Sequence, residues 1–576
     1  ELRIGIKLKS RNSGVLNLLR SDKNKKENLM VENQNLMRRL TISDWIAKSA
    51  AKTPNKVAYI YSLKGITTHQ LTYRELVSKA NHLANAFLKL GVSKGDRIAI
   101  LSHNCPQFAV YLLAIAKIGA WITPLNFALK GKEIVEIIEH AEPSVFIVED
   151  VLIDRILELH FTKQTIKEHI MINLKGDILL PKGWINFDEM WSEKESILEP
   201  TVDIAGSDVL NMIYTSGTEA MPKAVMNTHD NWNAAMITGF VDLHMTADTV
   251  TLISVPMYHV AGMHLMYNTL VTGGTVIMHY EPDVNEIVDL ISNQKVNFIA
   301  YPPTVFVSLL KAPIPDAEAF VQKTLSNIRY AIVFGSPLPE AYINKLNNLL
   351  PNIYFMNYYG QSELTSTGTT LQFPDMLRKT KESRTRFENA EPVGRPQIVN
   401  EMKIVDENDI ELQRGKTGEI VVRGPSIMAG YYKEPQKTKD CFKGGWHHTG
   451  DFGIMDEEGF IYFVDRKKDM VKSGGENVST VEVEGEIYNH PNVAEATVVG
   501  LPHPVWSEAL TAFVVAKSPE TINPDDIINH CKENLAGYKV PKRVFIVKEL
   551  PKNPSGKILK KELRILYKDS FTESPI

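Results

Sequence analysis

The chain has 576 residues, long enough for several domain-sized units and a large buried core. It carries 64 Lys and Arg residues against 68 Asp and Glu, a net charge of −4, and 44% of its residues are hydrophobic. This near balance excludes a generally basic nucleic-acid coat and a highly charged disordered chain. The three cysteines, Cys105, Cys441 and Cys531, lie far apart, so we expect neither a disulfide framework nor a Cys-based zinc site, and a reducing compartment is indicated.

The N-terminal segment, residues 1–39, differs from the rest of the chain. It holds ten Lys and Arg residues, four acidic residues and no long apolar core, so we expect a flexible solvated leader rather than a secretory signal. The most apolar run, Phe108 to Leu125, contains Lys117 and Gly119 and predicts a buried helix that leads into a strand. We therefore expect a cytoplasmic protein without a transmembrane segment, with peripheral attachment to a membrane left open.

Residues 40–465 alternate short apolar runs with helical stretches. Arg97–Leu101 is typical of a buried strand and Gln107–Ile118 of the helix after it, and the same alternation returns at Lys132–Val148 and Tyr330–Met356. Strands separated by helices indicate an α/β domain of mainly parallel sheets with helical cover. This pattern predicts one large N-terminal domain.

The pattern changes twice in the last third of the chain. Residues 393–465 favour a small β subdomain, with strands expected at Met402–Val405, Glu419–Val422 and Phe460–Val464. After the charged residues 466–468, which we interpret as a hinge, residues 469–576 predict a small mobile α+β domain that acts as a lid. Its expected helices are Val481–His490 and Pro524–Leu535, and its expected strands are Ala494–Val499, Ala509–Val515 and Arg543–Val547.

The segment Tyr214 to His229 carries the most informative chemistry. After a predicted strand it offers hydroxyls, a flexible glycine and a positive charge, a combination that suits a polyphosphate: Thr215, Ser216, Thr218, Gly217 and Lys223. It is not a Walker A loop, because Ala224 follows the lysine.

Four further segments contribute polar groups at strand ends and turns, where α/β folds place ligands. Asn357–Leu364 presents Glu363, a carboxylate that suits Mg²⁺. Gly445–Asp451 ends in an aspartate that suits a ribose diol. The segments Asp465–Glu476 and Pro551–Leu563 add Arg466, a Gly-Gly turn and Lys557.

Taken in this order, these segments resemble the adenylate-forming (AMP-binding) superfamily across roughly residues 40–565. Ser473–Ser479 and Pro256–His264 are most similar to fatty acyl-CoA synthetases. The resemblance implies a two-step reaction, in which a carboxylic acid attacks the α-phosphate of Mg·ATP and a thiol, usually that of coenzyme A, then displaces AMP. It implies a medium- or long-chain fatty acid as substrate, with ATP, Mg²⁺ and coenzyme A required and no nucleic acid involved.

The resemblance also implies roles for single residues. Thr215, Ser216, Gly217, Thr218 and Lys223 would cradle the phosphates, while adenine and the α-phosphate would lie among Gly335, Ser336, Pro337, Tyr358, Tyr359, Gly360, Gln361 and Ser362. Glu363 and Thr218 would hold Mg²⁺, and Asp451 and Arg466 the ribose. Lys557 would act in adenylation and His259 beside the carboxylate at the acyl pocket. Lys472, Gly474 and Gly475 would contact coenzyme A, and Lys468 would be the hinge.

The phosphate loop departs from the family pattern at Glu219, Ala220 and Ala224, and a carboxylate among phosphates is repulsive unless a cation offsets it. Two alternatives therefore stay open beside the acyl-CoA ligase. One is a peptide-synthetase-type enzyme that loads a carrier protein, and the other is a catalytically silent relative that binds acyl-AMP. The length of the acyl chain and the oligomeric state are not readable from the sequence.

Overall fold

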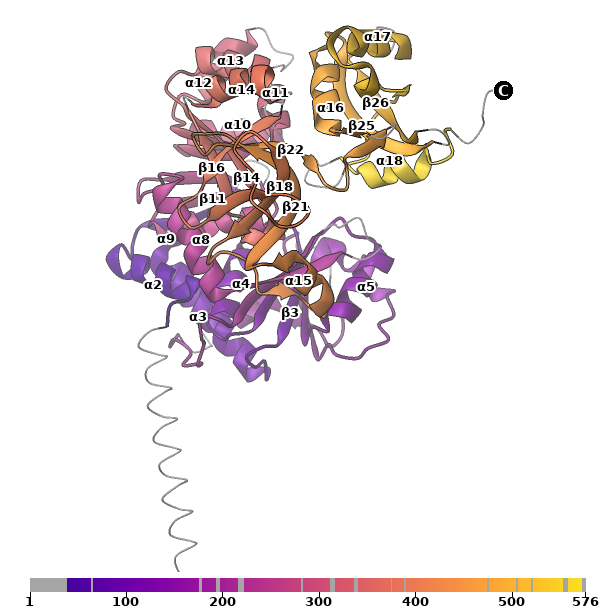
Figure 1. Ribbon diagram of the computed structural model, residues 1–576. Helices are drawn as coiled ribbons and strands as arrows, with labels where there is room; N and C mark the ends of the chain where they lie inside the picture. Colours follow the sequence, from indigo (N-terminus) through magenta and orange to yellow (C-terminus); the bar gives the residue numbers. More distant parts are fainter. Residues whose placement is uncertain are drawn as a thin grey trace, which may run out of the picture.

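The computed structural model describes residues 39–63, 66–175, 179–192, 197–215, 222–280, 283–310, 316–335, 340–373, 375–387, 390–473, 476–503, 506–518, 522–552 and 558–571. These residues form a large α/β body with a small C-terminal domain at one side (Figure 1). The predicted fold class, a large mixed domain followed by a small α+β domain, is confirmed.

The larger of the two N-terminal sheets has 14 strands. Its central strands run parallel, as the alternation of strand and helix predicts, and β15, which pairs with β14, begins an antiparallel extension. In spatial order the strands are β17 (Glu401–Val405), β18 (Thr417–Arg423), β21 (Trp446–Met455), β22 (Ile461–Arg466), β16 (Glu391–Pro396), β15 (Gly368–Gln372), β14 (Tyr354–Gly360), β13 (Tyr330–Phe334), β12 (Phe298–Tyr301), β10 (Val250–Ile253), β11 (Thr275–His279), β1 (Val57–Leu63) and β2 (Ile66–Thr72), and β20 (Phe442–Lys443) pairs with β21.

The second sheet has eight strands. Strands β3, β4 and β5 are parallel, with Ile98 of β3 opposite both Ile122 and Val145. In spatial order the strands are β19 (Gly430–Tyr431), β9 (Lys223–Thr228), β8 (Val209–Thr215), β4 (Trp121–Leu125), β3 (Arg97–Leu101), β5 (Val145–Glu149), β6 (Glu168–Ile172) and β7 (Ile185–Asn186).

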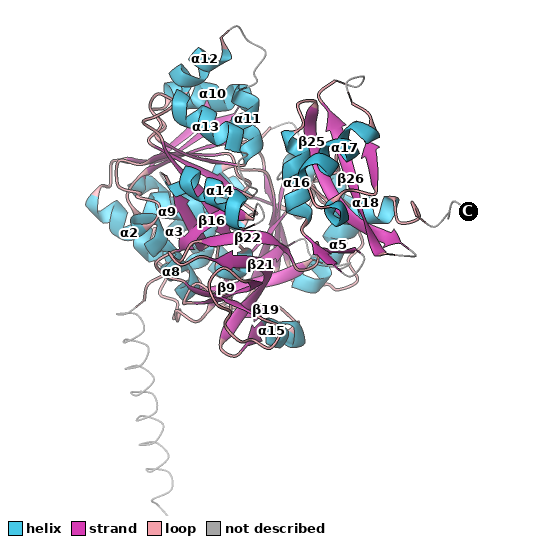
Figure 2. Ribbon diagram, turned by 45° about the horizontal axis from the view of Figure 1, so that its top comes forward, coloured by secondary structure: helices cyan, strands magenta, loops and turns pink. Residues whose placement is uncertain are grey.

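Helices lie on both faces of the two sheets (Figure 2). One core lies between the sheets and joins strands of both with α2 (Ile42–Lys52), α3 (Tyr73–Lys89), α4 (Pro106–Ala116), α8 (His229–Val241) and α9 (Val260–Val271). A second core packs the other face of the larger sheet against α10 (Val284–Asn293), α11 (Pro303–Leu310), α12 (Ala317–Thr324), α13 (Glu340–Leu349) and α14 (Asp375–Arg386). A third packs the eight-stranded sheet against α5 (Gly131–Ala141) and α6 (Asp154–Leu157), and α7 (Phe187–Met190) follows β7.

Local sequence explains where several of these helices begin. Thr41, Thr72 and Thr228 each accept a hydrogen bond from the backbone three residues later, which satisfies a free N–H at the start of α2, α3 and α8. Every residue of α4 is buried, so the apolar run from Phe108 is the predicted core helix leading to β4. Within the described part of the chain, no helix is long and apolar enough to cross a membrane.

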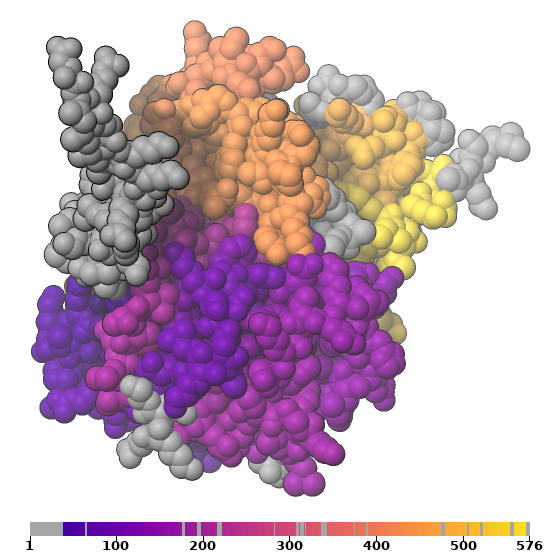
Figure 3. Space-filling view, turned by 90° about the horizontal axis from the view of Figure 1, so that it is seen from below, coloured from indigo at the N-terminus to yellow at the C-terminus, as the bar shows by residue number. Residues whose placement is uncertain are grey.

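The small domain has a five-stranded sheet and its own core. Its strands are β23 (Val471–Ser473), β24 (Glu476–Val478), β25 (Val493–His503), β26 (Ser507–Ala516) and β27 (Arg543–Ile546), covered by α16 (Thr480–Asn489), α17 (Pro524–Asn534) and α18 (Lys560–Leu566). Figure 3, which views the molecule from below, shows this domain in yellow at the side of a continuous face made by the early part of the chain in purple.

The strands of region 393–465 extend the 14-stranded sheet, because β16 pairs with β22 as well as with β15. The region also contains a short helix, α15 (Pro435–Cys441), and its strand β19 pairs with β9 in the other sheet. The region therefore bridges the two sheets beside the predicted phosphate loop.

Candidate active site

The predicted phosphate loop is the connection of a β-hairpin. Strands β8 and β9 pair antiparallel, so Thr215 and Lys223 lie opposite each other, and the Thr215 hydroxyl lies 3.4 Å from the Lys223 carbonyl oxygen. Ser216, Gly217 and Thr218 lie outside the described residues, as do the unusual Glu219 and Ala220. Ala224 is 1% exposed in β9, so this departure from the family pattern lies in a packed strand rather than in the loop.

A polar cluster joins side chains at the end of β14 to the Asp451 carboxylate on β21. The Asp451 carboxylate is 4% exposed and accepts hydrogen bonds at Oδ2 from the Tyr359 hydroxyl and from Gln361 Nε2, both at 2.7 Å. Arg466 Nε lies 3.8 Å from Asp451 Oδ1 on the neighbouring strand β22. Four predicted site residues from segments about 90 positions apart therefore meet at one carboxylate.

Glu363 lies in a second cluster, in the 3-10 turn η2 (Ser362–Leu364) that follows β14. Its Oε1 accepts a hydrogen bond of 2.9 Å from the Tyr431 hydroxyl, and Lys223 Nζ lies 5.0 Å from the centre of the Tyr431 ring. The tyrosine thus brings the loop lysine and the predicted metal ligand to one place. A single carboxylate beside a cation suits Mg²⁺, which keeps several waters and is completed by phosphate oxygens.

The backbone around Glu363 is fixed from β9. Asn227 donates from Nδ2 to the Ser362 carbonyl at 3.1 Å and to the Thr365 hydroxyl at 3.0 Å. Thr365 has φ +52°, a left-handed conformation, and a Cβ on Gly360 would come within 2.7 Å of the Thr367 carbonyl oxygen. The turn is therefore specified by Asn227 and by the glycine.

Tyr358 and Tyr359 point to opposite faces of β14. Tyr358 donates to the Ser366 carbonyl at 2.5 Å, on the side where its ring faces His264 of α9 at 6.2 Å. Burial, and then the charge of Asp451, raise the pKa of Tyr359 well above its ordinary value. Burial lowers the pKa of His264 to about 4, so this imidazole is neutral at pH 7. Both tyrosines therefore stay protonated donors.

His259 stands immediately before α9, after the end of β10. Its backbone N–H donates to the Pro256 carbonyl at 3.0 Å, and its ring lies 5.4 Å from that of Tyr258. A Cβ on Gly262 would come within 2.6 Å of the Pro256 oxygen, so the first turn of α9 needs a glycine there. The glycine three residues after His259 thus has a steric cause.

The other predicted residues are placed as follows. Gly335 follows β13 with φ +84°, as a glycine at a strand end readily does. Lys468 lies between β22 and β23 and is exposed, and the Lys472 N–H on β23 donates to Glu508 Oε2 at 2.8 Å within the small domain. Ser336, Pro337, Gly474, Gly475 and Lys557 lie outside the described residues.

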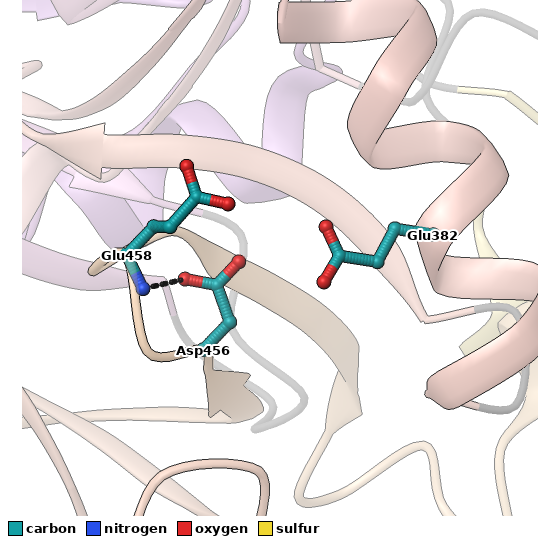
Figure 4. Close-up of side chains that lie close together, drawn as sticks. All are labelled: Glu382, Asp456 and Glu458. Carbon is teal, nitrogen blue, oxygen red and sulfur yellow. Dashed lines mark hydrogen bonds between the residues drawn. The ribbon is translucent and has the colours of Figure 1, made fainter.

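One acidic cluster lies away from these groups. Figure 4 shows the carboxyl groups of Glu382, Asp456 and Glu458 turned toward one another, with oxygen atoms within 4.8 Å. The fully buried Lys379 donates from Nζ to all three carboxylates, at 2.8, 2.6 and 2.8 Å. The lysine already supplies the positive charge, so the cluster is an ion-pair network around the buried Lys379 and Asp456 rather than a metal centre.

Comparison with known proteins identifies the family. The model of AMP-binding enzymes matches residues 46–432, and that of the AMP-binding enzyme C-terminal domain matches residues 482–557. The chain belongs to this family. It is 31% identical over 529 residues to the long-chain-fatty-acid–CoA ligase FadD13 of Mycobacterium tuberculosis, covering 91% of this chain and 98% of that protein.

Further relatives of this AMP-binding enzyme differ in the acid that their names give. It is 31% identical over 575 residues to the peroxisomal benzoate–CoA ligase of Arabidopsis thaliana, covering 93% of this chain and 95% of that protein. Among solved structures, ATP-bound MatB of Rhodopseudomonas palustris matches with a TM-score of 0.80 and 27% identity, covering 92% and 100% of the two chains. The predicted AMP-forming acid–thiol ligase is confirmed, and the enzyme is an acyl-CoA synthetase that uses ATP and coenzyme A.

Two residues of the site carry no signal in the sequence. Tyr431 lies on the two-residue strand β19, and Asn227 lies on β9, which has no alternating pattern that would predict its pairing with β8. Asn227 bonds the Ser362 carbonyl from β9, and Tyr431 bonds Glu363 from β19, which pairs with β9. Their roles depend on non-local strand pairing.

Proposed function

We propose that this acyl-CoA synthetase activates a medium- or long-chain fatty acid through an acyl-AMP intermediate. The observation that carries the proposal is the absence of charge along the helix next to His259: α9, which is largely buried, contains no Asp, Glu, Lys or Arg. In α8, which packs against α9, Asp230 in the first turn is the one such residue. A second carboxylate on the acid would find no cationic partner on these helices, and an ammonium group none on α9, whereas a hydrocarbon tail needs none.

The similarity to the long-chain-fatty-acid–CoA ligase FadD13 supports the same class of substrate. The benzoate and feruloyl relatives favour a second candidate, an aryl acid, which is also uncharged beyond its carboxylate. The two candidates differ in how affinity depends on the length of a flexible chain.

We assign the nucleotide to the two polar clusters. Asp451, oriented by Tyr359 and Gln361, would accept hydrogen bonds from the ribose hydroxyls, and Lys223 would contact the phosphates. Glu363 and Thr218 would hold Mg²⁺, which supplies neutralisation of phosphate charge when bound. The acid's carboxylate oxygen would attack the α-phosphorus, and pyrophosphate would leave.

A panel of free acids tests the substrate class, with pyrophosphate release as the readout. For straight-chain acids we expect kcat/KM to rise by roughly fourfold for each added methylene, because burying one contributes about 0.8 kcal/mol, until the pocket is full. Benzoate, ferulate and 2-succinylbenzoate are the comparison acids. A higher kcat/KM for an aryl acid than for every fatty acid would refute the proposal.

Lys557→Ala tests the assignment of the adenylating lysine. We expect pyrophosphate exchange with ATP to fall by about 10²–10³-fold, as for loss of one positioned charge at a developing anion. Thioester formation from supplied acyl-AMP should stay near the wild-type rate. Lys561→Ala, an exposed lysine four residues later on α18, is the control and should change neither reaction. Equal losses in both half-reactions of Lys557→Ala would contradict the assignment.

A further inference from the structure

Five aromatic or titratable side chains meet where the two N-terminal sheets bring the carboxyl ends of parallel strands together. Three follow or end strands β3, β4 and β5 of the eight-stranded sheet, and two follow β10 and β11 of the larger sheet. Ligands of α/β proteins bind at such strand ends. We call this group the His103 junction, and its members are His103, Phe127, Glu149, Tyr258 and Tyr280.

The Glu149 carboxylate organises the junction. It is fully buried and accepts hydrogen bonds from the Ser102 hydroxyl at 3.1 Å, from the His103 backbone N–H at 2.7 Å and from the Tyr280 hydroxyl at 2.6 Å. Burial alone would raise the pKa of Glu149, but the hydrogen bonds from His103 and Tyr280 hold it below its ordinary value. An ionised carboxylate only accepts, so His103 Nδ1, 2.9 Å from Glu149 Oε2, carries the proton.

Because Nδ1 is bonded to Glu149, Nε2 is the ring nitrogen left to exchange a proton with a ligand, and in the neutral tautomer it holds the lone pair. The His103 ring is stacked between those of Phe127, at 4.0 Å, and Tyr280, at 4.5 Å, which leaves only its edge accessible. The side chain is 13% exposed, and Nε2 makes no hydrogen bond within the described ranges. Charged groups nearby include Lys175, with Nζ 5.9 Å from the Tyr280 ring, and Arg155, which donates to the Phe127 carbonyl. The buried Asp150, next to Glu149, accepts from the Lys175 N–H at 2.8 Å.

The junction is connected directly to the residues around His259. The Asn104 side-chain amide donates from Nδ2 to the Val255 carbonyl oxygen at 3.2 Å and accepts at Oδ1 from the Met257 N–H at 2.8 Å. The ring of Phe127 contacts that of Tyr258 at 5.5 Å, and Tyr258 lies against His259 at 5.4 Å. The Tyr258 hydroxyl is buried without a hydrogen-bond partner among the residues described, which suits a position where a ligand supplies a polar group.

We propose that His103 is the base that accepts the thiol proton of coenzyme A in the thioester-forming half-reaction, with Glu149 and Tyr280 as positioning residues. The thiol proton passes to His103 Nε2, and a sulfur electron pair forms the C–S bond at the acyl carbon. The C–O bond to AMP breaks, and AMP leaves with that electron pair. The imidazolium then returns its proton to water at the exposed edge. The inference rests on the acyl-CoA synthetase reaction and not on the chain length of the acid.

His103→Gln is the first test, because glutamine keeps a polar side chain of similar reach but accepts no proton at neutral pH. With acyl-AMP made from an acid that the wild-type enzyme adenylates, we expect thioester formation at pH 7 to fall by about 10²–10³-fold, within the range for loss of a general base. ATP–pyrophosphate exchange should stay within about twofold, so failure here is distinguishable from a wrong choice of acid. Equal losses in both half-reactions would overturn the proposal.

The pH dependence separates a base from a packing role. The loss in thioester-formation rate of His103→Gln relative to wild type should shrink by about tenfold per pH unit, up to the thiol pKa of about 8.5. At higher pH the thiolate forms without a base. A deficit that is the same at every pH overturns the proposal. The wild-type rate of thioester formation should stop rising with pH below the thiol pKa. A wild-type rate that simply follows the thiolate fraction also overturns the proposal.

Glu149→Gln is the second variant, and it keeps the imidazole. Without an anion at Nδ1, we expect the rate of thioester formation at pH 7 to fall by roughly tenfold, with ATP–pyrophosphate exchange retained. An unchanged rate of thioester formation would contradict the role of Glu149. His169→Gln is the matched control. His169 is a partly buried histidine on β6 of the same sheet, with its ring 4.9 Å from that of Trp184, and its replacement should alter neither half-reaction.

Discussion

Replacing Asp451 with asparagine separates nucleotide binding from the rest of the reaction. The side chain keeps its shape but loses its charge, at a position that is 4% exposed and already oriented by Tyr359 and Gln361 at 2.7 Å. Bonds to a charged acceptor contribute about 1.5–3 kcal/mol and neutral ones about 0.5–1.5 kcal/mol. For two ribose hydroxyls the difference is about 2–3 kcal/mol, which corresponds to roughly 30–150-fold in kcat/KM for ATP.

The assay is pyrophosphate release with ATP, acid and coenzyme A varied in turn. Because acyl-AMP carries the same ribose, the KM of supplied acyl-AMP should rise as well, while the KM values of the acid and of coenzyme A should change by less than about twofold. Asp440→Asn is the control, because Asp440 is an exposed aspartate on α15 that accepts from Gln436 Nε2 at 2.8 Å. A folded Asp451→Asn enzyme with unchanged KM for ATP and acyl-AMP would refute the assignment of the ribose.

Three further predictions concern stability and the hinge. Burial raises the pKa of Asp242 to about 6 at the C-terminal end of α8, so its ionisation opposes folding as pH rises through that value. Because solvent screens this half-buried group, Asp242→Asn should raise the free energy of unfolding by about 1–2 kcal/mol at pH 7 and by little at pH 4, measured by urea denaturation. Lys379→Met should lower that free energy by about 3–5 kcal/mol at pH 7, because the buried Asp456 carboxylate loses the cation that pairs with it, whereas Lys381→Met, exposed on the same helix, should have no effect beyond about 0.5 kcal/mol. Lys468→Pro should keep pyrophosphate exchange and slow transfer to coenzyme A, because proline fixes one φ angle; unchanged transfer would place the pivot elsewhere.

The sequence alone predicts the parts of the fold that depend on local pattern. The buried helix and strand from Pro106 to Leu125, and the alternation around β13 and β14, follow from apolar periodicity over short distances. The meeting of Tyr359, Gln361, Asp451 and Arg466 was expected only through the family resemblance, since no spacing relates β14 to β21. Non-local pairing of strands brings them together.

The His103 junction shows why the remaining groups escape sequence reasoning. Glu149 ends an otherwise apolar strand and His103 follows another, so each looks like an isolated polar residue at the margin of a core. Their hydrogen bond requires β3 and β5 to be neighbours in register, and Tyr280 reaches them from the other sheet. The sequence around β3 and β5 gives no indication that a residue of the other sheet, Tyr280, completes the group.

Hydrogen bonds between residues on either side of residue 468 determine the free-energy cost of moving the small domain. Asp465 precedes Lys468 and is 2% exposed, and its Oδ2 accepts from the Thr480 N–H at 2.6 Å and the Thr480 hydroxyl at 2.9 Å, at the start of α16. Rotation at Lys468 moves these partners relative to each other, so the bonds are lost unless the linker between them rearranges as one piece. A buried carboxylate that loses its donors costs about 1–3 kcal/mol or more. If Lys468 is the hinge, a second conformation of the small domain must therefore replace the Thr480 donors of Asp465 or expose its carboxylate to water.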